Sequence, residues 1–217
     1  MEHIGVREVV TIGGLHFNIE TILMTWLSML ITIIFAGLAV RKLSIVPGGV
    51  QNVLEIIISW LDGQAANKMG KRSHIYMPLI TALFIFLLTS NLLGLIPFLE
   101  SPTNDLNTTF ALALLVVAIV HFSGLFFKRS HYIAHFFQPF APFVVINLIE
   151  EFAKPVTLAF RLFGNILAGE ILIIVLLHLV PIWMPIPSVV WLAFSIFIST
   201  VHAVIFSMLS MAYIGND

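Results

Sequence analysis

The fold follows from the sequence FVVINLIEEFAKPVTLAFRLFGNILAGEILIIVLLHLV, which covers residues 143–180. Charged residues stand here within otherwise apolar sequence, and charges inside a membrane helix usually have a function. A single helix of this length would extend about 57 Å at about 1.5 Å per residue, nearly twice the hydrocarbon thickness of about 30 Å. We therefore expect one long helix that lies steeply tilted in a membrane or bends at Pro155.

The composition of the whole chain agrees with a membrane location. Hydrophobic residues make up 59% of the sequence, charged residues only 10%, and the mean hydropathy is +1.06, far from the average of soluble domains. The chain has no cysteine, which excludes disulfides, thiolate nucleophiles and zinc-thiolate sites. A net charge of −1 gives no basic surface for nucleic acid, so no nucleic-acid partner is expected.

Segments without charged residues predict the other membrane helices, because an upright helix needs about 20 apolar residues to cross. Such segments cover residues 21–40, 73–99 and 106–127, and a longer one, 171–216, is interrupted by Pro181, Pro185 and Pro187. We expect an all-α integral membrane protein whose last two spans form a long tilted hairpin. The five predicted transmembrane helices cover residues 21–42, 75–97, 107–127, 143–180 and 188–213.

Between the first two spans, residues 50–66 have the apolar periodicity of an amphipathic helix. Its charged residues Glu55 and Asp62 favour a position on the cytoplasmic interface or against a partner helix over a position across the membrane. A packed loop helix without a function of its own is the alternative.

Seven of the eight basic residues outside the long helix indicate the topology. They gather in loops that one side of the membrane would share: Arg41, Lys42, Lys68, Lys71, Arg72, Lys128 and Arg129. By the positive-inside rule these loops are cytoplasmic, which places residues 1–20 outside and the C-terminus in the cytoplasm. Residues 1–20 show no basic segment and cleavage site of a removable signal peptide, and we expect a bacterial plasma membrane.

Arg161 is the most informative single residue. A guanidinium near the middle of a bilayer costs about 2.5 to 3.5 kcal/mol on insertion scales, so it should face protein or water and have a carboxylate partner. Glu170 is nine residues further, about 900° of helical rotation, and therefore lies on the opposite face. Asn165 shares the face of Arg161 but carries no charge. We expect the counter-charge on another subunit, with a structural arginine that snorkels to the interface as the alternative.

A polar face is also predicted on the last span, where Ser195, Ser199 and His202 stand at i, i+4 and i+7. These side chains can hydrate an ion path. The alternative is ordinary helix packing, with serines bonded to their own helix and a histidine satisfied between helices.

The sequence KPVTLAFRLFGNILAGE at residues 154–170 closely resembles the signature of subunit a of F-type ATP synthases. The resemblance extends to SNLLGLIP at residues 90–97 and to AFSIFISTVHAVIFSML at residues 193–209, and in order and spacing it covers most of the chain. One departure is His202, where the family pattern usually has glutamine.

The resemblance implies an ion-translocating stator whose tilted hairpin lies against a rotating ring of c subunits, each with a carboxylate. The family's essential arginine corresponds to Arg161, which would attract each ionised ring carboxylate and separate two half-channels for H⁺ or Na⁺. Asn165 would line the rotor face, and Glu170 would belong to the outer half-channel. The b subunits, the other synthase subunits and membrane lipid are the further partners implied.

Two further expectations concern other residues of the long helix. Glu150 and Glu151 are candidates for the cytoplasmic half-channel, although acids at a solvated helix start are an equally good explanation. Gly164 and Ala168 are expected to permit close helix packing at the rotor face.

Other functions have little support in the sequence. It contains no nucleophile elbow, P-loop or zinc-protease motif, so we expect no catalytic residue, metal or cofactor, and nucleotide chemistry would reside on other subunits. A haem-binding electron-transfer subunit, with ligands among His121, His178 and His202, is one alternative. The other is a small secondary transporter that binds an anion through Arg161, although no internal repeat supports it.

Overall fold

The computed structural model describes residues 9–12, 15–41, 43–70, 73–96, 99–128, 143–179 and 186–216. The first elements are the strands β1 (Val9–Ile12) and β2 (Leu15–Asn18), followed by the helices α1 (Ile19–Val40) and α2 (Val50–Met69). The others are α3 (Ser73–Leu93), the 3₁₀ helix η2 (Pro102–Asn104), α4 (Leu106–Lys128), α6 (Phe143–Leu179) and α7 (Ile186–Asn216).

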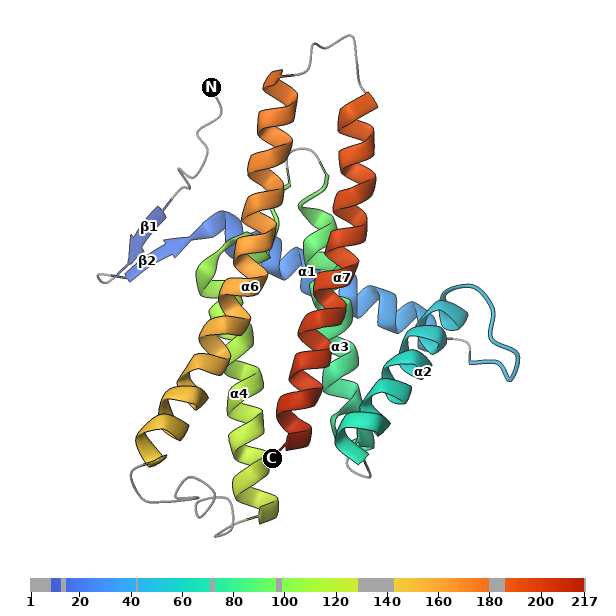
Figure 1. Ribbon diagram of the computed structural model, residues 1–217. Helices are drawn as coiled ribbons and strands as arrows, with labels where there is room; N and C mark the ends of the chain where they lie inside the picture. The colour runs from blue at the N-terminus through green and yellow to red at the C-terminus, as the bar shows by residue number, and fades with distance from the viewer. Residues whose placement is uncertain are drawn as a thin grey trace.

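Four of these helices, α3, α4, α6 and α7, stand side by side as a bundle, and α1 crosses behind them (Figure 1). α4 packs against α6 and α3 against α7, whereas α1 contacts α3 and α2. α6 is one continuous helix that passes through Pro155, and its amino-terminal part leans away from α7 (Figure 1). The long pair α6 and α7 therefore forms one side of the bundle.

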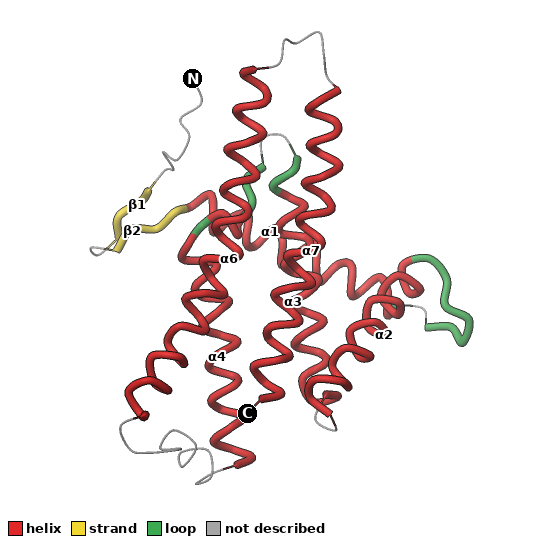
Figure 2. Tube along the Cα trace, in the orientation of Figure 1, coloured by secondary structure: helices red, strands yellow, loops and turns green. Residues whose placement is uncertain are grey.

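The strands β1 and β2 pair as an antiparallel hairpin with Val9 opposite Asn18 and Ile12 opposite Leu15 (yellow in Figure 2). β-branched residues dominate β1, and Gly13 and Gly14 separate the two strands in the sequence, a combination typical of a two-residue hairpin turn. The prediction of an all-α chain misses this hairpin. Outside it, the regular structure in the described part of the chain is helical.

The chain is a multi-pass membrane protein by the length and composition of its helices. Four of the described helical segments are long and apolar enough to cross a membrane, and α6, with its five charged residues, is not among them. These segments are Ile19–Val40, Ser73–Leu93, Leu106–Ser123 and Trp191–Gly215.

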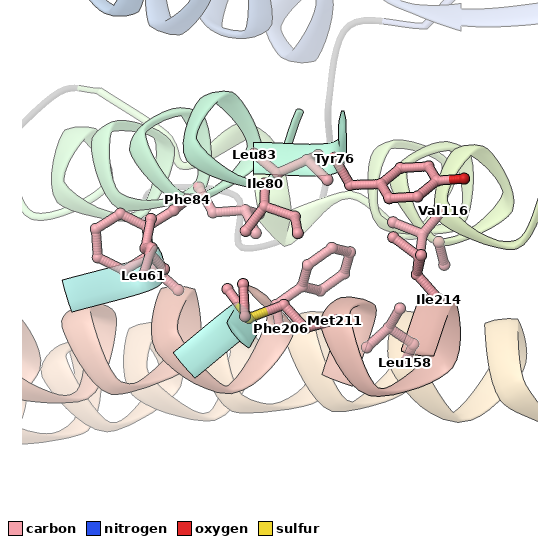
Figure 3. Close-up of a cluster of buried hydrophobic side chains, with 14 of the residues drawn as sticks. Leu61, Tyr76, Ile80, Leu83, Phe84, Val116, Leu158, Phe206, Met211 and Ile214 are labelled. Atoms are coloured by element: carbon pink, nitrogen blue, oxygen red, sulfur yellow. The ribbon is translucent and has the colours of Figure 1, made fainter. Parts of the chain in front are cut away.

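The hydrophobic core joins the bundle to α2 (Figure 3). Leu61 and Ala65 of α2 are fully buried, whereas Ile56 on its other face is 60% exposed. One face of α2 therefore packs on α3 and α7, and its exposed face also carries apolar residues such as Ile56. Residues of each bundle helix contribute to the same core, including Ile80, Val116, Leu158 and Phe206.

Polar contacts fix the helices relative to one another. Thr32 of α1 and Thr89 of α3 share a hydrogen bond of 3.1 Å. Asp105 caps α4 by accepting a hydrogen bond from the backbone N–H of Asn107 (2.9 Å), and it also accepts one from the hydroxyl of Thr21 in α1 (3.0 Å). The turn between α3 and α4 is thereby held against α1.

Candidate functional site

Arg161 lies near the middle of α6 with its side chain exposed. No carboxylate in the described part of the chain lies within ion-pair distance of its guanidinium. The small cavity beside it has a volume of about 10 Å³, room for about one water molecule. This cavity is lined by Arg161, Leu158 and Leu162 from α6 and by His202, Ile205 and Phe206 from α7.

Small residues continue along α6 from Arg161. Gly164 and Ala168 are both exposed, and a Cβ atom added at Gly164 would meet no atom within 4 Å. This strip, Gly164 and Ala168, offers a surface on which the backbone of another helix can come close to Arg161. Asn165 and Glu170 also lie in α6, but their side chains are outside what the structure describes.

A larger cavity of about 430 Å³ opens between α3, α6 and α7, and we call it the α3–α7 cavity. The predicted polar face of α7 borders it with Ser195, Ser199 and His202, each at least nine-tenths buried. On the α6 side, Ala168 and Gly169 border it. A cavity of this size with polar groups in its wall has room for several water molecules.

A hydrogen-bond network forms the α3 wall of this cavity. The side-chain amide of Asn91 donates to the backbone carbonyl of Ser199 (3.3 Å), and the hydroxyl of Thr103 donates to the Asn91 carbonyl (2.8 Å). The hydroxyl of Ser101 donates to the backbone carbonyl of Ser90 (3.0 Å). The end of α3 and the following turn are thereby fixed to α7.

Sequence reasoning did not assign these residues of α3 and the following turn to the site. The available signal was the polar pair Ser90 and Asn91 at the end of a charge-free segment. A polar pair alone does not reveal that α3 ends beside the middle of α7, because that contact depends on the packing of distant segments.

Two polar side chains give the α3–α7 cavity its chemistry. The indole nitrogen of Trp191 is buried at the cavity wall and has no hydrogen-bond partner among the described residues, so a water molecule in the cavity can accept its N–H. His202 borders both the α3–α7 cavity and the small cavity of Arg161. His202 therefore stands between the α3–α7 cavity and the small cavity that Arg161 lines.

A second group of charges lies near the amino-terminal end of α6. The Lys154 Nζ is 2.6 Å from one oxygen of Glu151, and the His121 Nε2 of α4 is 3.7 Å from the other. The Lys154 ammonium also lies 5.8 Å from the ring centroid of Tyr213 in α7, a favourable cation–π geometry. Glu150 is exposed beside this group.

The structure thus separates the predicted residues into two places. One place is the junction of α6 and α7, around which lie Arg161, Ser195, Ser199, His202, Gly164 and Ala168. The other is toward the start of α6, where Glu150 and Glu151 lie. Among the described residues, no group of three or more His, Asp or Glu side chains could hold a metal ion.

Comparison with known proteins identifies the family of the chain. A family model described as ATP synthase A chain matches residues 22–215. The chain is 49% identical to an ATP synthase subunit a of Desulforamulus reducens over 213 residues, which cover 94% of this chain and 81% of that relative. It is 37% identical to an ATP synthase subunit a of Moorella thermoacetica over 218 residues, which cover 100% of this chain and 98% of the relative.

The match spans the whole bundle, including α6 with Arg161 and α7 with the polar face. Such a match decides against the haem-binding and transporter alternatives. The chain belongs to the ATP synthase subunit a family, the ion-translocating stator subunits of the F-type ATP synthases.

Proposed function

We propose that Arg161 is the cation through which this stator couples ion flow to rotation. The observation that carries the proposal is the position of Arg161, exposed on α6 beside Gly164 and without a carboxylate partner in the described part of the chain. A guanidinium in a membrane protein needs an anion. The carboxylate of a c subunit, brought close over the small-residue strip, supplies it.

The chemistry of coupling follows from the fixed charge. Arginine remains protonated at working pH, so it favours the ionised form of any carboxylate that faces it. A ring site therefore releases its ion as it approaches Arg161 and binds another after it has passed. The same charge repels a free cation and keeps ions from moving directly between the two half-channels.

We assign the outer half-channel to the α3–α7 cavity. Its volume of about 430 Å³ and its polar wall of Ser195, Ser199 and His202 suit a water-filled path that ends beside Arg161. In this proposal Glu170 belongs to the same half-channel and Asn165 to the rotor face. Glu150, exposed near the start of α6, and Glu151 beside it are the acids closest to the proposed cytoplasmic exit.

The proposed topology has five crossings, with α6 as the fifth beside the four apolar segments. The N-terminus then lies outside and the C-terminus in the cytoplasm, in the plasma membrane of a bacterium. The subunit itself performs no bond chemistry. It works in contact with the c-ring, the b subunits and the other synthase subunits, which include the nucleotide-binding head.

ATP-driven acidification of inverted membrane vesicles tests the role of Arg161. We expect Arg161→Ala to assemble, as judged by co-purification of the ring and the ATPase head, and to lose pumping. Arg41→Ala is the matched control, because Arg41 is an exposed arginine at the end of α1, and it should pump like the wild type. Pumping by the assembled Arg161→Ala complex would refute the proposal.

A further inference from the structure

α6 carries a second cation on the side of Arg161. Lys154 precedes Arg161 by seven residues, about 700° of helical rotation, so the two residues point within about 20° of each other. They are separated by about 10 Å along the helix axis. If Arg161 faces the rotor, a free ammonium at Lys154 would stand close to the path of the same ring carboxylates.

The two cations differ in their partners. Lys154 is only 23% exposed, its ammonium lies 2.6 Å from the Glu151 carboxylate, and Glu151 is 13% exposed. The ammonium also lies toward the Tyr213 ring of α7. Arg161, by contrast, is exposed and has no ion pair within the described part of the chain.

We propose that Glu151 neutralises Lys154 and holds it against α7, so that Arg161 is the single free cation on this side of α6. The inference rests on the proposed role of Arg161 and adds a positioning role for Glu151. Without Glu151, the lysine, a point charge on a flexible stem, would reach the rotor face and pair with passing ring carboxylates. Each such ion pair would keep the ring carboxylate ionised and would delay rotation.

Among the described residues, His121 of α4 also lies near Glu151, with its Nε2 3.7 Å from the second carboxylate oxygen. That oxygen is buried and has no hydrogen bond among the described residues. Glu151 therefore faces one permanent cation, Lys154, and one histidine. The geometry makes the lysine its principal partner, because the distance to the lysine is shorter by about 1 Å.

A double-mutant cycle tests this role by ATP-driven pumping in inverted vesicles. We expect Glu151→Gln to assemble and to pump roughly tenfold more slowly, the effect of one competing ion pair of about 1.4 kcal/mol. Glu151→Gln combined with Lys154→Met should recover most of the rate, because both charges are then absent. Glu55→Gln, which removes an exposed carboxylate of α2, is the matched control and should pump normally.

Two results would overturn the inference. The first is a double variant that remains as slow as Glu151→Gln, which would mean that Glu151 acts directly on the ion. The second is normal pumping by Glu151→Gln, which would mean that the charge of Lys154 has no effect on the rotor. If Glu151→Gln does not assemble, the swapped variant Glu151→Lys/Lys154→Glu becomes decisive, since it keeps a neutral pair and should pump. Arg161→Ala, measured in parallel, shows separately whether the proposed coupling role fails.

Discussion

A substitution at Gly164 can test contact with a rotor without disturbing the packing within the subunit. A side chain at this position has open space within the subunit, and leucine favours a helix over glycine by up to about 1 kcal/mol. We therefore expect Gly164→Leu to leave folding of the subunit intact. We expect this variant to assemble but to pump roughly tenfold more slowly or worse, because added bulk holds the ring carboxylate away from Arg161 and Coulomb attraction weakens with distance.

Gly37→Leu is the control for that experiment. Gly37 is also a helical glycine with no atom within 4 Å of an added Cβ, but it lies in α1. Its leucine variant should pump normally in the same vesicle acidification assay. Normal pumping by Gly164→Leu would show that no rotor helix comes close to this surface.

Gly215 illustrates a contact between two elements. It lies in the last turn of α7, where an added Cβ would clash with the backbone carbonyl of Lys68 at the end of α2. We expect Gly215→Ala to destabilise the protein by about 1–3 kcal/mol, the usual cost of overpacking. Because about 1 kcal/mol shifts the midpoint of a domain of this size by roughly 2–4 °C, thermal unfolding of the purified protein in detergent measures the effect.

The matched variant is Gly63→Ala. Gly63 lies in α2 with open space around it, and alanine improves helix propensity there by about 1 kcal/mol. Its unfolding midpoint should equal or exceed that of the wild type. Equal midpoints for Gly215→Ala and Gly63→Ala would mean that the ends of α2 and α7 are not in contact.

Local patterns explain which elements could be anticipated from the sequence. The charge-free segments contain most of α1, α3 and α4, because a run of apolar residues is visible without knowledge of its neighbours. The predicted second span, 75–97, extends beyond α3, which ends at Leu93. The period of Ser195, Ser199 and His202 likewise places them on one face of α7, and all three border the α3–α7 cavity. In each case the information lies within one helix.

Two features were not anticipated although both are local in the sequence. The hairpin of β1 and β2 is short and stands beside a long apolar helix that dominates the pattern. The second feature is the partner of Lys154. Glu151 precedes it by three residues in α6, and side chains three apart are neighbours on a helix, so this spacing was the available signal.

The number of membrane crossings is a property of the whole molecule. The four apolar segments alone would give four crossings and put both ends of the chain on one side, whereas α6 as a fifth puts them on opposite sides. The charges of α6 lower its hydropathy, but they are distributed over a helix of 37 residues that packs against α4 and α7. Helix packing can therefore hold α6 in the membrane although its composition does not meet the apolar criterion.

Single-cysteine labelling distinguishes these topologies, and the chain has no native cysteine to interfere. Ile45→Cys lies in the exposed loop after α1, and Asn216→Cys lies at the end of α7. With α3, α4, α6 and α7 all crossing between them, both positions are cytoplasmic and should react with a membrane-impermeant maleimide in inverted vesicles. Glu100→Cys, between α3 and α4, should react only in intact spheroplasts. If Ile45→Cys and Asn216→Cys, in variants that still pump, are labelled from opposite sides, α6 does not cross the membrane. Arg161 could then not lie between two half-channels.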